Sequence, residues 1–179
     1  MKIAISQRQV EIKGIVYDCL EQGWYELFLG HEVIPIPNLN NIGLDVDMLV
    51  LSGGETTEDR YNTEIACAAW ATANDIPILG VCQGAFLLNY LHSGINAKGI
   101  QGHDNTTHDI EMEGSTFIVN SYHTTTIHEL GIDLTPIAVS GELVEAFKHN
   151  DRREWGIVWH PERMDDPVLP SDLRELIYG

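Results

Sequence analysis

The residues best suited to chemistry surround Cys82, in the stretch Leu-Gly-Val-Cys-Gln-Gly-Ala-Phe over positions 79–86. An apolar segment leads into the cysteine, a glycine stands two residues to either side, and an apolar helical run follows. This spacing is typical of a nucleophile elbow with cysteine in the serine position. Glycines make room for a strained turn, and a helix N-terminus favours the thiolate. The pattern predicts that Cys82 is a nucleophile, whereas a buried cysteine between two ordinary turn glycines is the alternative.

A second candidate group lies near the C-terminus, in Trp-Gly-Ile-Val-Trp-His-Pro-Glu over positions 155–162. Pro161 disfavours a helical conformation for His160 and holds the segment extended. In an extended chain, residues two apart point the same way, so Glu162 can reach one imidazole nitrogen of His160 while the other faces a nucleophile. A base oriented by a carboxylate is what a cysteine nucleophile requires. The pattern therefore predicts a Cys82–His160–Glu162 triad.

Two further motifs complete an ordered set: Leu-Ser-Gly-Gly at 51–54 and Val-Asn-Ser-Tyr-His at 119–123. With the cysteine elbow and the Trp-His-Pro-Glu segment, they occur in the order found in class I glutamine amidotransferases. The chain resembles most closely the free-standing γ-glutamyl hydrolase branch of that superfamily. The resemblance extends from the first strand to about Arg163.

The resemblance implies hydrolysis of a γ-glutamyl amide through a glutamyl-thioester on Cys82, with no cofactor. It also implies an oxyanion hole formed by the backbone N–H groups of Gly54 and Gln83. The 121–123 segment (Ser121, Tyr122, His123) corresponds to the part of the family that frames the glutamyl end of the substrate.

One departure from the family pattern concerns the glutamyl group. Many members carry glutamine four residues after the nucleophile, where this chain has Phe86. The glutamyl group must then be held by other residues. The candidates are Gln83, Glu55, Arg8 and the Ser121–His123 segment.

Several substrates are compatible with the resemblance. The opening Ile-Ser-Gln-Arg at 5–8 and the Gln-Gly-Ala-Phe after the cysteine look like hydrolases that release CDP-amidate from its γ-glutamyl conjugate in capsule phosphoramidate biosynthesis. γ-Glutamyl-polyamine or γ-glutamyl-aminobutyrate hydrolysis is the next alternative. A glutaminase subunit that supplies ammonia to a partner synthetase is favoured less. A different kind of function is also open: the chain is then a non-catalytic binding or stress-response protein on the same fold.

Composition limits the partners. The chain has 179 residues, 44% hydrophobic and 21% charged, and a formal net charge of −17, which argues against nucleic acid and anionic membranes. No signal peptide or membrane-spanning run is predicted, and three scattered cysteines fit a reducing cytoplasm. We expect a small γ-glutamyl molecule as substrate and leave a homodimer open.

The pattern of apolar residues predicts one α/β domain over residues 1–179. We expect a three-layer sandwich with a central, mostly parallel sheet, flavodoxin-like and of the class I glutamine amidotransferase type. Strands are predicted at 2–6, 31–37, 47–52, 76–81, 107–112, 115–119, 134–140, 142–148 and 155–159. Helices are predicted at about 14–29, at 58–74, after Cys82 and at 171–178.

Two expectations concern charged and metal-binding groups. An anionic substrate needs cations in so acidic a protein, and Arg8, Arg60 and Arg163 lie near the predicted strand ends. The alternative is that all three form weak surface ion pairs. His103 and His108 lie in one polar loop, but no third ligand appears at a suitable spacing, so no metal is expected.

Overall fold

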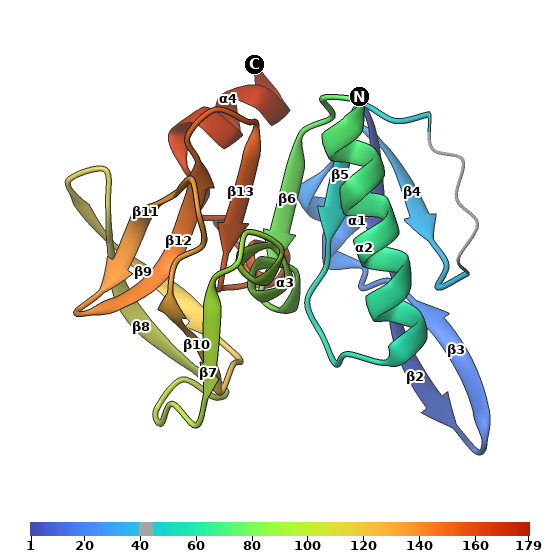
Figure 1. Ribbon diagram of the computed structural model, residues 1–179, viewed down its shortest axis with the longest axis horizontal. Coiled ribbons are helices and arrows are strands. Elements are labelled where there is room, and N and C mark those ends of the chain that lie inside the picture. The colour runs from blue at the N-terminus through green and yellow to red at the C-terminus, as the bar shows by residue number, and fades with distance from the viewer. Residues whose placement is uncertain (40–44) are drawn as a thin grey trace.

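The fold is described from a computed structural model, which covers residues 1–39 and 45–179. Within these residues, 11 strands form one mixed sheet, and β2 (Arg8–Ile12) and β3 (Ile15–Cys19) form a separate hairpin. One half of the sheet is parallel and the other antiparallel (Figure 1).

The parallel half places five strands in the order β4-β1-β5-β6-β13. Their side chains are mostly apolar and almost fully buried in β5, β6 and β13, as expected for parallel strands covered on both faces. The bounds are Glu32–Ile36 (β4), Lys2–Ser6 (β1), Met48–Leu51 (β5), Ile78–Val81 (β6) and Glu154–Ile157 (β13).

The antiparallel half continues from β13 through β12, β11, β8 and β9, while β10 pairs with both β12 and β7. Buried and exposed residues alternate along parts of these strands, which leaves one side partly open to solvent. The bounds are Leu143–His149 (β12), Leu134–Ser140 (β11), Thr106–Met112 (β8), Ser115–Ser121 (β9), Thr125–Glu129 (β10) and Ile95–Lys98 (β7).

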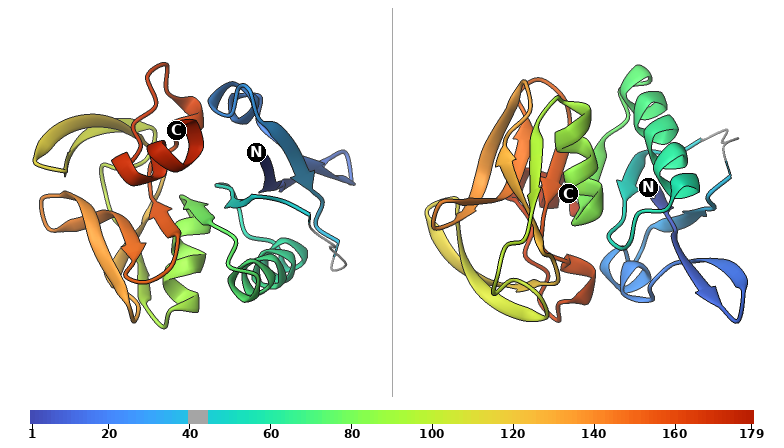
Figure 2. Two further views of the ribbon diagram at one scale, coloured as in Figure 1. Left: turned by 90° about the horizontal axis from the view of Figure 1, so that it is seen from above. Right: turned by 60° about the horizontal axis from the view of Figure 1, so that its bottom comes forward.

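Helices lie on both faces of the sheet. Helices α2 (Glu58–Ala73) and α3 (Gln83–Leu91) pack on one face, and α1 (Gly23–Leu27) and α4 (Ser171–Tyr178) on the other (Figure 2, left). A short 3-10 helix, η1 (Pro161–Arg163), follows β13. The three-layer α/β fold predicted from the sequence is confirmed.

Two parts of the secondary-structure prediction are wrong. The segment 14–29 was expected to be one helix, but it contains β3 and the five-residue α1. Lys13 and Gly14 have φ values of 53° and 78°, which close a tight hairpin between β2 and β3. Strand β2 was not predicted either, nor were β7 and β10, which are short and without a clear apolar alternation.

The register of the parallel strands brings the sequence motifs together. Val81 of β6 pairs with Ile157 of β13, and Leu51 of β5 pairs with Gly80 of β6. Cys82, the 52–54 turn and His160 therefore follow the carboxyl ends of three adjacent strands, where ligands bind in open α/β sheets.

Among the described helices, none has the length and apolar character needed to cross a membrane.

Candidate active site

Cys82 sits in a strained turn between β6 and α3. Its φ of 51° and ψ of −104° are unusual for a residue with a side chain, and its N–H donates to the Ile157 carbonyl at 2.8 Å. A Cβ on Gly84 would lie 2.1 Å from the Leu51 carbonyl oxygen, and one on Gly80 would lie 2.6 Å from the Gly84 backbone. Both flanking glycines are therefore required by close packing, as the elbow pattern indicates.

His160 lies beside both Glu162 and Cys82. Its Nδ1 and Glu162 Oε1 are joined by a 2.6 Å hydrogen bond, and both side chains are almost completely buried. Burial alone would lower the pKa of His160, but its hydrogen bonds to Cys82 and Glu162 raise that pKa to about 9. The imidazole is thus held in its charged form at neutral pH, next to the sulfur.

Asn120 fixes the backbone at His160. Its Oδ1 accepts from the His160 N–H at 2.8 Å, and its Nδ2–H donates to the His160 carbonyl at 2.8 Å. Sequence reasoning missed this role, although Asn120 lies inside the Val-Asn-Ser-Tyr-His motif. We class it as a positioning residue, because both contacts are to the backbone of His160.

The Ser-Gly-Gly turn after β5 contacts the histidine directly. A Cβ on Gly53 would lie 2.4 Å from His160 Cε1, and Gly54 has a φ of 121° with Arg8 and Arg60 packed against it. Gly54 and Gln83 line the same cleft as Cys82. The N–H of Gln83 lies in the first turn of α3, where N–H groups lack partners within the helix.

Arg60 was expected near the substrate, but it lies buried beneath the Ser-Gly-Gly turn. Its side chain is completely buried, and it donates to the carbonyls of Ser52, Gly53 and Glu55 at 2.5, 3.1 and 3.1 Å. It also pairs with the buried Glu64 at 2.9 Å. The prediction that Arg60 attracts an anionic substrate is wrong: it holds the turn that carries Gly54.

A cleft of about 620 Å³ lies over the cysteine. Of the substrate-binding candidates from the sequence, Arg8, Glu55, Gln83, Tyr122 and His123 line it. Ser121 is fully buried and donates its hydroxyl to the His103 carbonyl at 2.5 Å, so the structure does not bring it to the cleft. Phe86, which replaces the family's glutamine, also lines the cleft, and its ring centroid is 6.2 Å from that of His123.

Three basic residues border this cleft: Arg8, Arg163 and Lys98. Arg8 and Arg163 share Glu21, at 2.9 Å and 2.6 Å respectively, and Arg163 also lies 4.8 Å from the ring centroid of Tyr122. Burial works against the charge of Glu21, but its hydrogen bonds to Arg163 and Arg8 lower the pKa of the carboxyl group. Glu21 and Lys98 were missed from the sequence, because both lie in segments whose structure was not correctly predicted.

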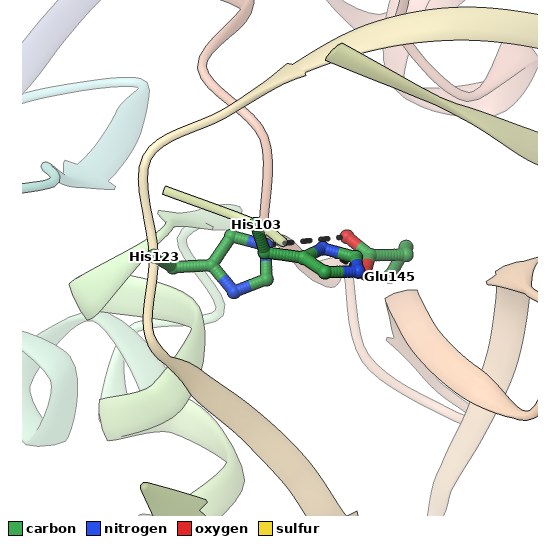
Figure 3. A group of neighbouring side chains, drawn as sticks. All are labelled: His103, His123 and Glu145. Atoms are coloured by element: carbon green, nitrogen blue, oxygen red, sulfur yellow. Dashed lines mark ion pairs between the residues drawn. The ribbon is translucent and has the colours of Figure 1, made fainter. Parts of the chain in front are cut away.

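Histidines gather behind one wall of the cleft. The sequence indicated only His103 and His108 as a potential metal pair, and the fold adds His123 and Glu145 to them (Figure 3). No metal was expected because a third ligand was lacking, and that reason no longer holds. Burial lowers the pKa of His103 and His123, although the nearby carboxylate of Glu145 opposes this.

The family follows from comparison with known proteins. The family model described as glutamine amidotransferase class-I matches residues 15–174. The chain belongs to the class I glutamine amidotransferase family. That match covers the elbow, the Ser-Gly-Gly turn and the His-Pro-Glu segment.

Individual relatives agree with this family. The chain is 29% identical to a γ-glutamyl-CDP-amidate hydrolase of Campylobacter jejuni, over 82% of this chain and 81% of that protein. It is 25% identical to one subunit of the glutamine-hydrolysing GMP synthase of Archaeoglobus fulgidus, over 90% of this chain and 89% of that one. A crystal structure of a glutamine amidotransferase from Thermotoga maritima superposes with a TM-score of 0.72 at 17% identity, covering 90% of this chain and 76% of that one.

Proposed function

We propose that this protein is a cysteine-dependent amidohydrolase that cleaves the γ-glutamyl amide bond of a small molecule. The observation that carries the proposal is the chain of contacts from Cys82 through His160 to Glu162 at the floor of an open cleft. Family membership supports the reaction class, because the family is named for chemistry at the amide of glutamine.

The proposed reaction has two steps. The Cys82 sulfur attacks the γ-carbonyl carbon, the C–N bond breaks, and His160 gives a proton to the leaving nitrogen. This leaves a glutamyl-thioester on Cys82. His160 then takes a proton from water as the water oxygen attacks the thioester, the C–S bond breaks and glutamate leaves, and the proton on His160 is shared again with the Cys82 sulfur. Glu162 orients the imidazole, and the N–H groups of Gly54 and Gln83 stabilise the oxyanion.

For the substrate, we propose an anionic γ-glutamyl conjugate, with γ-glutamyl-CDP-amidate as the most specific candidate. One support is the name of the Campylobacter jejuni relative. The other is that Arg8, Lys98 and Arg163 border the cleft of a protein whose net charge is −17. Cations placed at the cleft offset the repulsion that the rest of the molecule exerts on an anion.

The experiment is a measurement of glutamate release by the protein alone, with γ-glutamyl-CDP-amidate, γ-glutamyl-putrescine and glutamine. We expect the highest kcat/KM with the nucleotide conjugate. Faster turnover of γ-glutamyl-putrescine would instead favour a γ-glutamyl-polyamine as the substrate. Cys19→Ala is the matched control for Cys82→Ala, because Cys19 lies in the β2–β3 hairpin and does not line the cleft.

A second candidate is a glutaminase subunit that feeds a partner synthetase. The similarity to a GMP synthase component from Archaeoglobus fulgidus favours it. It predicts turnover of free glutamine only after a synthetase is added, and that result would contradict the stand-alone hydrolase.

Thiol reactivity distinguishes a non-catalytic protein on this fold from the two catalytic proposals, the stand-alone hydrolase and the glutaminase subunit. Burial, with the charge of Glu64, raises the pKa of Cys67 to about 12, so this thiol provides an internal reference for an unreactive cysteine. We expect iodoacetamide at neutral pH to alkylate Cys82 much faster than Cys67 or Cys19. Equal rates would remove the basis of the catalytic proposal.

A further inference from the structure

Four ionisable side chains converge behind the wall of the cleft formed after β9. His103 lies in the loop before β8, His108 on β8, His123 just after β9, and Glu145 on β12. The Glu145 carboxylate is 3.7 Å from His103 Nδ1, 3.5 Å from His108 Nε2 and 3.8 Å from His123 Nε2. The rings of His103 and His123 both face that carboxylate (Figure 3).

Several polar atoms of these groups are buried without the partners that buried polar atoms require. Glu145 is 1% exposed and His123 5%. Among the described residues, no hydrogen bond reaches Glu145 Oε2, His103 Nδ1, His123 Nε2 or either ring nitrogen of His108. Leaving so many buried polar atoms unpaired in one place is unfavourable, so a missing partner is indicated.

The hydrogen bonds around His123 show what kind of partner fits. Its Nδ1 lies 2.7 Å from the Thr125 carbonyl oxygen, which can only accept, so Nδ1 carries the proton. In the neutral ring, Nε2 then presents a lone pair to the carboxylate of Glu145. Two acceptors facing each other need either a proton or a metal cation between them. A backbone carbonyl that orients the far nitrogen is also the usual support of a metal-binding histidine.

We propose that His103, His123 and Glu145 bind a divalent transition-metal ion of the Zn²⁺ class, with His108 as the fourth ligand. In a tetrahedral zinc site, bond lengths of about 2.0–2.1 Å put neighbouring ligand atoms about 3.3 Å apart. Each histidine lies 3.5 to 3.8 Å from one of the two Glu145 oxygens, and the donor atoms of the three-residue group lie within 4.8 Å of one another, so the ligands must move inward to reach the tetrahedral spacing. A set rich in imidazole selects zinc-like ions over magnesium or calcium.

The ion stabilises the wall of the cleft and takes no part in bond cleavage. It joins the loop before β8, the end of β9 and β12, three segments far apart in the sequence. Of the four ligands, only His123 lines the cleft, next to Tyr122, whose ring packs edge-on against His160 at 5.6 Å between centroids. Binding of the metal therefore fixes the segment that we propose to face the glutamyl group.

The test is metal binding by the full chain, without an affinity tag of histidines. After removal of metal with a chelator, Zn²⁺ and Co²⁺ are titrated, and thermal unfolding is followed with and without Zn²⁺. We expect one equivalent of metal per chain, an absorption spectrum of tetrahedral Co²⁺, and an unfolding midpoint that rises by several degrees at saturating Zn²⁺.

Variants locate the site. Glu145→Gln and His103→Gln should weaken Zn²⁺ binding at least about 100-fold, since even supporting residues of metal sites change affinity by 10–100-fold. His108→Ala, with three ligands left, is the milder variant should Glu145→Gln fail to fold by circular dichroism. His128→Gln changes an exposed histidine of β10 outside the cluster and should bind metal normally.

Cys82→Ser separates this site from the thiol, and it should retain one equivalent of metal. The proposal is overturned if the wild-type protein shows no saturable binding. It is equally overturned if Cys82→Ser loses the metal while Glu145→Gln keeps it.

Discussion

The parallel and antiparallel halves of the sheet contribute to the cleft in different ways. In the parallel half, the important features belong to the backbone: the strained Cys82, the Gly54 turn and the first N–H groups of α3. In the antiparallel half, they are side chains that reach across strands, such as Asn120 to His160 and His123 toward Glu145. Backbone features are fixed by local sequence, whereas contacts between strands depend on the completed topology.

Substitutions in the two halves should therefore differ in size of effect. A change at the triad or in the glycine turn should damage catalysis directly. A change in the antiparallel half should act more weakly, through the placement of His160 or of the substrate.

The largest effect among these is expected from Glu162→Gln. The amide can hold the imidazole in the wrong tautomer, and in a serine protease the equivalent change costs about 10,000-fold in kcat. We expect a loss of roughly 1,000- to 10,000-fold in kcat at pH 7 with the fold retained. Glu175→Gln, on the exposed side of α4, is the control. An activity within about tenfold of wild type would contradict the role of Glu162.

The same variant should change the pH dependence. The pKa of His160 is raised above its usual value of 6.5 to about 9, so the charged imidazole is favoured by the fold. Its contribution to stability is fully present below pH 6.5 and is lost as the pH rises through about 9. We expect the alkaline limb of kcat/KM near pH 9 in the wild type and at lower pH in Glu162→Gln. An unmoved limb would show that another group titrates there.

The next largest effect is expected from Gly53→Ala, which tests the backbone features of the parallel half. The added Cβ would lie 2.4 Å from His160 Cε1, so the ring must move. Misplacement of a reacting group by about 1 Å can cost about 100-fold, and we expect a loss of that order in kcat. Gly114→Ala is the control, because its φ of 76° is strained but its surroundings are open. That control should reduce thermal stability without reducing kcat.

Asn120→Ala tests the antiparallel half with a smaller effect. It removes two hydrogen bonds to the His160 backbone, each worth about 1 kcal/mol, so we expect kcat to fall about 10- to 100-fold with KM little changed. Asn120→Asp keeps the acceptor for the His160 N–H and should be intermediate. If KM rises instead while kcat is kept, Asn120 contacts the substrate rather than positioning the base.

The smallest effect is expected from Arg8→Ala. Arg163 and Lys98 remain at the cleft, so we expect KM for an anionic γ-glutamyl substrate to rise about tenfold, equal to about 1.4 kcal/mol, with kcat nearly unchanged. Arg153→Ala, beside Asp75 and away from the cleft, is the matched control. An unchanged KM in Arg8→Ala would mean that backbone N–H groups, not cations, recognise the anion.

What could be predicted from the sequence follows the same division between local backbone features and contacts across strands. The α/β fold, the elbow at Cys82 and the proximity of His160 to the cleft could be predicted, because glycine spacing and strand ends are local signals. The β2–β3 hairpin could also have been predicted, because Lys13-Gly14 is a turn signal, but the apolar pattern was interpreted as a helix over 14–29. The pairing of Glu21 with Arg163 could not be predicted, because it joins residues 142 positions apart.

Arg60 and Glu145 illustrate why other parts of the site could not be predicted from the sequence. An arginine after a glycine turn can face solvent, substrate or backbone, and only the packing of α2 decides that Arg60 is completely buried. Glu145 lies on a strand with no motif around it, and its meeting with three histidines depends on β12 lying against β10 and β11. Such contacts become visible only once the strand order is known.

The central claim is that Cys82 carries a γ-glutamyl group during turnover. The most direct measurement is mass spectrometry of the protein after rapid acid quenching with a γ-glutamyl substrate, followed by mapping of the adduct. We predict a glutamyl adduct on the peptide that contains Cys82, absent from Cys82→Ala, which should also have lost hydrolysis. Full hydrolysis by Cys82→Ala, or an adduct on Cys19 or Cys67 alone, would contradict the account.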